Sequence, residues 1–191
     1  MNTESGGGGS ATQAFVGRTR ELAELGNGLQ DAAAGSGRLF LIVGAAGIGK
    51  TRLAEELAVE AGRGGARVLW GRCWEGGGAP AYWPWIELIR TLLRDLPPET
   101  VQDLIGNGAS YVAQVVPELR EHLRETPPLA TPSVVDPEPA QFPLFDAVAT
   151  FLKNAAAVQP LVIVLDDLHD ADEPSLLLLQ FLVQKGLKFL H

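Results

Sequence analysis

The fold of this 191-residue chain is decided by the stretch Gly44-Ala45-Ala46-Gly47-Ile48-Gly49-Lys50-Thr51. It has the spacing G-x-x-x-x-G-K-[ST], which is typical of a phosphate-binding loop. The apolar run Arg38–Val43 precedes it and predicts a buried strand, and apolar residues at helical spacing follow it over Arg52–Ala61. Because strand, glycine-rich loop and helix are the context that this motif requires, the sequence predicts a P-loop (Walker A motif).

The residue types of this loop suit a polyphosphate. Glycines let backbone N–H groups turn toward the phosphates, and the first turn of the helix adds unpaired N–H groups and its positive dipole end. Lys50 is predicted to reach the β- and γ-phosphates, and the Thr51 hydroxyl to bind Mg²⁺. A Gly-rich turn without function is the alternative, since the chain has 22 Gly, but the matching flanks favour the P-loop. The predicted nucleotide-binding residues here are Gly44, Ala45, Ala46, Gly47, Ile48, Gly49, Lys50, Thr51 and Arg52.

A second apolar strand ends in two carboxylates, in Leu161-Val162-Ile163-Val164-Leu165-Asp166-Asp167. A continuous apolar run is typical of a strand buried on both faces of a parallel sheet, and ligands of open α/β sheets bind beyond the carboxyl ends of the strands. Asp166 is therefore predicted to hold Mg²⁺ together with Thr51 (Walker B motif), and Asp167 to be a catalytic acid that polarises the attacking water. A strand followed by a polar turn is the alternative, which the upstream P-loop disfavours.

Composition narrows the class of protein. The formal net charge of −8 argues against a general nucleic-acid surface, because phosphate backbones require clustered Lys and Arg. The single cysteine, Cys73, allows no disulfide within the chain and is predicted to be a buried thiol. Residues 1–13 do not resemble a signal peptide, and no apolar run is long enough to span a bilayer. We therefore expect a cytoplasmic protein that binds a nucleotide and neither a membrane nor nucleic acid.

Periodicity predicts further elements around the two motifs. Five aromatic residues, Trp70, Trp74, Tyr82, Trp83 and Trp85, are predicted to pack in the core, with base stacking or a partner surface as the alternative. His169 is predicted to be a polar loop residue, and Pro127–Pro139 an extended loop. Ala66–Arg72 is expected to be the second strand of the chain, and Leu161–Leu165 the third. The expected helices span about Phe15–Ala34, Arg52–Ala61, Ile86–Leu96, Glu99–Ile105, Ser110–Val116, Pro117–Arg124, Phe142–Ala157 and Pro174–Val183.

Four segments together resemble one family. They are Phe15–Leu22, the P-loop, the run Gly71–Trp85 with the letters GRCWEGGGAPAYWPW, and Leu165–Asp172 with the letters LDDLHDAD. The chain is similar to the AAA-type ATPase module of STAND-class signalling proteins, including large ATP-binding LuxR-type transcription regulators and relatives fused to cyclase domains. It also resembles the ATPase domain of origin-recognition and Cdc6-like proteins. The resemblance covers about Phe15 to Leu182, nearly the whole chain.

The resemblance implies a three-layer α/β fold of the P-loop NTPase type (ASCE, AAA-like), with a parallel sheet and a helical insertion between strands 2 and 3. It implies ATP or ADP with Mg²⁺ as cofactors, and it places Val16, Gly17 and Arg18 near the adenine. It further implies a slow ATPase that uses ATP versus ADP as a switch, with other domains or copies of the full-length protein as partners. The domain is then expected over 14–185, between a flexible tail at 1–13 and a second tail at 186–191.

The family sheet has five parallel strands in the order 5-1-4-3-2, and only strands 1 to 3 are found here. The sensor strand, arginine finger and helical lid would lie beyond His191, so the fold is expected to be incomplete at the C-terminus and to hydrolyse little ATP alone. No ladder of hydrogen bonds is expected between Leu39–Val43 and Leu161–Leu165, because strand 4 belongs between them.

Two functions therefore stay open at this point. One is an ATP-binding, weakly hydrolysing switch module of a signalling or transcription-regulatory protein. The other is a truncated, non-catalytic remnant or interaction fragment without ATP turnover. A P-loop kinase or GTPase is disfavoured, because the chain contains no Asn-Lys-x-Asp guanine motif.

Overall fold

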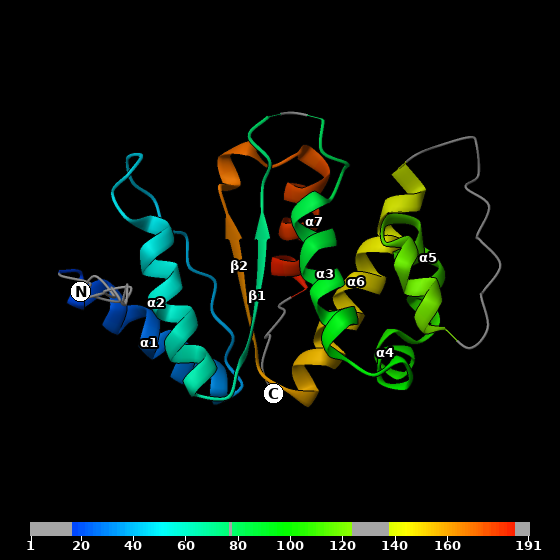
Figure 1. Ribbon diagram of the computed structural model, residues 1–191, viewed down its shortest axis with the longest axis horizontal. Coiled ribbons are helices and arrows are strands. Elements are labelled where there is room, and N and C mark those ends of the chain that lie inside the picture. Colours follow the sequence, from blue (N-terminus) through cyan, green and yellow to red (C-terminus); the bar gives the residue numbers. More distant parts are fainter. Residues whose placement is uncertain (1–16, 77, 124–137, 186–191) are drawn as a thin grey trace, which may run out of the picture.

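The computed structural model describes residues 17–76, 78–123 and 138–185 of the chain (Figure 1). Two strands, β1 (Arg67–Arg72) and β2 (Leu161–Asp166), lie among helices. The α-helices are α1 (Thr19–Ala33), α2 (Lys50–Arg63), α3 (Trp83–Asp95), α4 (Pro98–Ile105), α5 (Ala109–Val115), α6 (Glu138–Val158) and α7 (Glu173–Gln184). Short 3₁₀ helices are η1 (Gly106–Gly108), η2 (Pro117–His122) and η3 (Leu168–Asp170).

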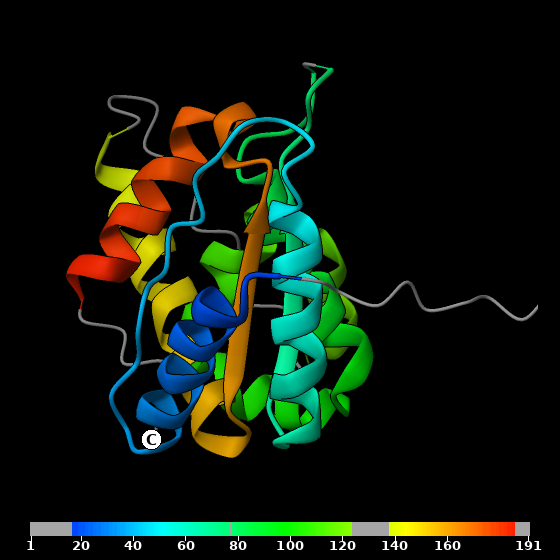
Figure 2. The same ribbon diagram turned by 90° about the vertical axis from the view of Figure 1, so that its left-hand side faces the viewer.

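The two strands form a parallel sheet in which Arg67 is the register partner of Leu161 and Arg72 that of Asp166. Both strands therefore end at the same edge. Parallel neighbours need a long crossover, and α3 to α6 supply it, as the predicted helical insertion required. Figures 1 and 2 show α1 and α2 on one side of the sheet and α3, α6 and α7 on the other. This layering is the predicted α/β arrangement.

The hydrophobic core is unequal on the two sides of the sheet. The larger cluster joins α3 to α6, and its fully buried side chains include Leu88, Leu92 and Phe151. On the α1–α2 side, the buried cluster consists of Leu25, Leu53 and Leu57. Since burial of apolar area is the main stabilising term, the insertion helices contribute more to the free energy of folding than the layer that carries the P-loop.

The predicted first strand, Arg38–Val43, is wrong for the described chain: the segment is an unpaired coil in Figure 2, and Leu41 and Val43 are 73% and 81% exposed. A strand is defined by hydrogen bonds to a neighbour, and within the described residues the only strand paired with β2 is β1. The segment therefore has the apolar composition of a strand but no hydrogen-bonded neighbour within the described residues. As expected from the family strand order, no ladder joins this segment to β2 among the described residues.

The other elements follow the predictions closely, with shifts at their ends. The helix expected from Phe142 begins at Glu138, so Pro139 lies in the first turn of α6, where proline costs little, and not in the predicted loop. The segment expected as a helix from Pro117 is the 3₁₀ helix η2. The rest of the Pro-rich loop and both predicted tails, 1–13 and 186–191, lie outside the described residues.

The prediction that all five aromatic residues pack in the core is only partly right. Tyr82 and Trp85 are buried, and the Trp85 indole N–H donates to the Ser175 carbonyl at 3.1 Å. Trp74, in the loop after β1, is 58% exposed. Trp70 and Trp83 are half-buried and line a surface groove.

Candidate functional site

The P-loop joins the Arg38–Val43 segment to α2, which begins at Lys50. Gly47 and Gly49 have φ values of 73° and 91°, in the left-handed region that favours glycine. No atom lies within 4 Å of a Cβ built at either position, so these glycines are required by backbone conformation and not by crowding. The loop itself is exposed, with its chain leading into the N-terminal turn of α2.

The Lys50 side chain folds back across this loop. Its Nζ donates to the carbonyl oxygens of Gly44 at 3.1 Å and Ala45 at 3.2 Å. Both bonds are to exposed backbone groups, so a phosphate can replace them at small cost. The ammonium therefore lies where a polyphosphate in the loop would need a compensating charge.

Thr51 and Asp166 meet although 115 positions separate them in the sequence. The Thr51 Oγ1 donates to the two carboxylate oxygens of Asp166 at 3.3 and 3.4 Å. The contact joins the first turn of α2 to the carboxyl end of β2, and the Asp166 side chain is only 12% exposed. The structure thus brings together the two residues that the sequence predicted as Mg²⁺ ligands.

Arg72 is a site residue that the sequence analysis missed. Its Nη2 donates to the Asp166 carboxylate at 3.0 Å, and the Asp167 backbone N–H donates to the same carboxylate at 3.1 Å. The hydrogen bond and the negative charge of Asp166 raise the pKa of the Arg72 guanidinium above its ordinary value. The sequence could have indicated Arg72, because it lies at the carboxyl end of a predicted strand and the carboxyl ends of parallel strands meet at one edge of the sheet.

Asp167 lies beside this cluster and not inside it. Its backbone is left-handed, with φ 54°, and its side chain is 43% exposed, with an oxygen 3.8 Å from the Arg72 Nε. Asp167 and neighbouring carboxylates also act on Cys73, which is buried as predicted. Burial first, and then the nearby negative charges of Asp172 and Asp167, raise the pKa of the Cys73 thiol to about 11, so it is a poor nucleophile at neutral pH.

The turn before α1 reaches the P-loop. Gly17 and Arg18 have φ values of 93° and 58°, and the Arg18 Nη2 donates to the Ile48 carbonyl at 2.7 Å. The predicted adenine-side residues Gly17 and Arg18 are therefore adjacent to the predicted phosphate loop. Val16, predicted with them, lies outside the described residues.

Arg52 is directed along its own helix. Its guanidinium pairs with Glu55 at 3.2 Å and Glu56 at 2.7 Å. Its predicted role at the nucleotide is thus limited to the backbone N–H of the first helical turn. His169 is exposed, as expected for a polar surface residue, but it lies in the 3₁₀ helix η3 and not in a loop; its Nε2 is 3.2 Å from the Asp170 carboxylate.

The residues at this edge suit a nucleotide and Mg²⁺. Mg²⁺ prefers oxygen ligands and is commonly held by one or two carboxylates together with substrate phosphates, and Thr51 and Asp166 supply one hydroxyl and one carboxylate. Lys50 adds a cation and the N-terminal turn of α2 adds N–H donors. The donor set is the one expected for a phosphate chain that bridges the loop and the metal.

In the comparison with protein families, residues 14–187 match a family described as "AAA ATPase domain". Comparison with curated proteins and with solved structures gives no match. No helix in the described ranges combines the length and the apolar character needed to cross a membrane.

Proposed function

Because the chain belongs to the family of AAA ATPase domains, we propose that it binds ATP and ADP with Mg²⁺ as a weakly hydrolysing switch module of a signalling or transcription-regulatory protein. Family membership itself indicates nucleotide binding. The observation that carries the proposal is the Thr51–Asp166 contact at the mouth of the P-loop, which joins the two motifs across 115 positions.

Each site residue has a role that follows from its chemistry. Lys50 compensates the charge of the β- and γ-phosphates, and Thr51 and Asp166 hold the cation. When bound, Mg²⁺ neutralises charge between the phosphates. Asp167 would orient the attacking water, and the turn at Gly17 and Arg18 would contact the adenine.

Weak hydrolysis follows from how the charged groups are engaged. Phosphoryl transfer depends on several positioned cations acting together, and an arginine finger alone can be worth about 10³–10⁵ in rate. Here the Arg72 guanidinium is held by Asp166, while the Arg18 guanidinium and the Lys50 ammonium both bond to backbone carbonyls of the phosphate loop. While Arg72 pairs with Asp166 its charge is not available to the transferred phosphate, and we expect ATP binding with only slow turnover.

Calorimetric titration of the 191-residue chain tests the proposal. Mg·ATP is titrated into the unsubstituted chain, into Lys50→Ala, and into Lys153→Ala, a matched control on an exposed position of α6. We expect saturable binding that Lys50→Ala reduces by at least tenfold and Lys153→Ala leaves unchanged. Equal affinities of all three would remove the P-loop assignment. A titration with Mg·GTP compares the affinities for the two bases, and we expect tighter binding of ATP than of GTP.

A second candidate is a non-catalytic interaction fragment. The observation that favours it is the run of exposed apolar side chains at Leu39, Phe40, Leu41 and Val43, since such surfaces mark contacts with other chains or domains. The same titration separates the two, because an interaction fragment without a working P-loop takes up no Mg·ATP.

A further inference from the structure

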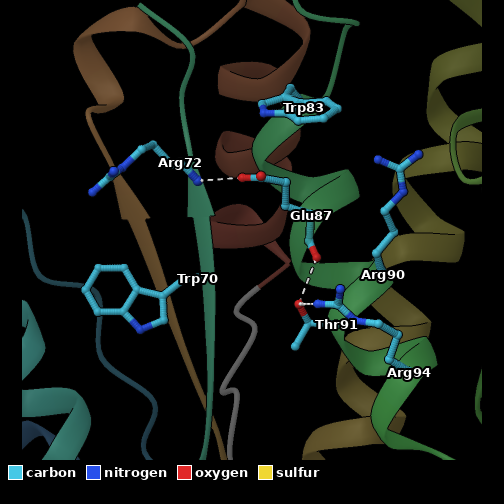
Figure 3. A pocket seen from close by; sticks show the side chains of 7 residues that line it. All are labelled: Trp70, Arg72, Trp83, Glu87, Arg90, Thr91 and Arg94. Carbon is cyan, nitrogen blue, oxygen red and sulfur yellow. Dashed lines mark hydrogen bonds between the residues drawn. The ribbon is translucent and has the colours of Figure 1, made fainter.

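A groove of about 470 Å³ lies between β1 and α3, apart from the P-loop (Figure 3). Trp70 and Arg72 line it from the strand, and Trp83, Glu87, Arg90 and Arg94 line it from the helix. In Figure 3, Trp70 and Arg72 project to one side of β1 and the helical side chains lie on the other. β1 therefore runs between the two sets of side chains, and its edge away from β2 faces α3, where the Arg72 N–H meets Glu87.

That edge of β1 has no strand beside it in the described part of the chain. The backbone N–H groups of Arg67 and Cys73 donate to the carbonyls of Pro160 at 2.7 Å and Asp166 at 3.0 Å, on the β2 side. Since amides alternate along a strand, those of Val68, Trp70 and Arg72 point to the groove. The Arg72 N–H donates to the Glu87 carboxylate at 3.1 Å, which takes the place that a carbonyl of a neighbouring strand would have.

Three guanidinium groups and one carboxylate line the groove, on a chain whose net charge is −8. Arg72 pairs with Asp166 and Arg90 with Glu118, so within the described residues Arg94 is the groove arginine without a carboxylate partner. The Arg94 Nη2 donates to the Thr91 hydroxyl at 3.1 Å, a neutral partner that leaves its charge uncompensated by that contact. Arg90 lies one helical turn earlier on α3, and its guanidinium is directed toward Glu118 of η2.

Aromatic and arginine side chains also meet in the groove. The Arg90 guanidinium lies over the Trp83 ring at 5.8 Å from its centroid and pairs with Glu118 at 2.7 Å. Trp70 and Trp83 are both half-buried, so each has ring surface left to cover. Tryptophan and arginine are enriched among the residues that dominate protein–protein affinity, which favours a macromolecular occupant.

We propose that the groove binds an acidic, extended segment of a partner protein, which adds as a strand to the free edge of β1. The main chain of such a segment pairs with Val68 and Trp70, and a carboxylate of the segment approaches Arg94. This mode is strand addition, in which backbone bonds give affinity and alternate side chains give specificity. A peptide fits better than a small anion, because the exposed groups are a row of backbone donors and acceptors along the strand. The proposal does not depend on nucleotide binding.

The test uses a fluorescein-labelled eight-residue peptide of alternating glutamate and valine, titrated with the 191-residue chain and followed by fluorescence anisotropy. We expect saturable binding that Arg94→Glu weakens about tenfold, while Lys153→Glu, the same charge change on α6, has no effect. Arg94→Gln gives a smaller loss in the same direction. Superimposable circular dichroism melting curves verify that these variants fold alike.

Two further peptides separate strand addition from simple charge attraction. A peptide with lysine in place of glutamate should not bind, and one that is N-methylated at alternate residues should bind at least tenfold more weakly, since it has lost its donors along one edge. Equal binding of the N-methylated peptide would overturn strand addition, and equal affinities of the Arg94→Glu and Lys153→Glu chains would overturn the groove as the site. Full displacement by millimolar inorganic phosphate would identify a small-anion site instead. Self-association that is lost in Arg94→Glu, seen by sedimentation, would make a second copy the occupant.

Discussion

The ion pair between Arg72 and Asp166 gives the most discriminating prediction about the nucleotide site. The Arg72 Nη2 lies 3.0 Å from the carboxylate on which the proposed Mg²⁺ site depends. Arg72 and the cation therefore compete for the same negative charge. We predict that Arg72→Gln increases the factor by which Mg²⁺ strengthens ATP binding.

The size of this effect follows from the exposure of the two partners. A hydrogen bond to a charged group is worth about 1.5–3 kcal/mol, and an exposed ion pair about 0.2–1 kcal/mol. The Asp166 side chain is 12% exposed and that of Arg72 is 66% exposed, so water screens the pair from one side. We take about 1 kcal/mol, which corresponds to a change of about fivefold in the ratio of dissociation constants.

The assay is calorimetric titration of ATP in EDTA and again in excess Mg²⁺. The ratio of the two dissociation constants should rise about fivefold in Arg72→Gln and stay near the unsubstituted value in Arg72→Lys, which keeps the charge. Arg63→Gln, at an exposed position of α2, serves as the matched control. An unchanged or smaller ratio in Arg72→Gln would refute the competition, and weaker binding in both buffers would show that Arg72 contacts the nucleotide.

Three further predictions concern the metal, the loop and the core thiol. Asp166→Asn should weaken ATP binding in Mg²⁺ more than ATP binding in EDTA, because the carboxylate acts through the cation. Calorimetry with and without Mg²⁺ measures both affinities, and an equal loss of affinity in the two buffers would contradict the role of Asp166 as a Mg²⁺ ligand. Gly49→Ala places a Cβ at φ 91° and should destabilise the chain by about 1 kcal/mol or more in urea unfolding, whereas Gly62→Ala, within α2, should not. The raised pKa of Cys73, about 11 against an ordinary 9.0, means that the unfolded chain loses this proton at lower pH than the folded chain. Stability should therefore fall as the pH rises from 9 to 11, and Cys73→Ala should remove part of this slope in urea unfolding curves; an identical slope would exclude the thiol as its source.

Local signals predicted most of the elements of this fold. The P-loop letters define the start of α2, because its glycines need positive φ and its lysine begins a helix. Periodic apolar residues predicted α3 and α6, which form most of the core. Asp166 was found because its apolar strand and its carboxylate are adjacent in the sequence.

The features that could not be predicted depend on contacts between residues that are far apart in the sequence. Arg38–Val43 has the composition of a buried strand, but strand formation requires a neighbour, and no strand beside it is described. Arg72 became a site residue only through the register that places it opposite Asp166, 94 positions away. The same holds for Trp70 and Trp83, whose half-buried rings depend on how α3 packs along β1.

The two sides of the sheet have hydrophobic cores of different size, and this difference determines which part of the molecule a bound nucleotide would stabilise most. Lys50 and Thr51 belong to α2, whose packing on α1 relies on the small Leu25–Leu53–Leu57 cluster, whereas Asp166 is held by β1 and the larger core. On the proposed function, a nucleotide with its cation is held by both parts at once. A ligand that binds the folded state adds about 2.7 kcal/mol of stability at a hundredfold excess over its dissociation constant. The larger core is already well packed without a bound nucleotide. We therefore expect nucleotide binding to stabilise mainly the α1–α2 layer, and the contact between Thr51 and Asp166 to couple that layer to the sheet.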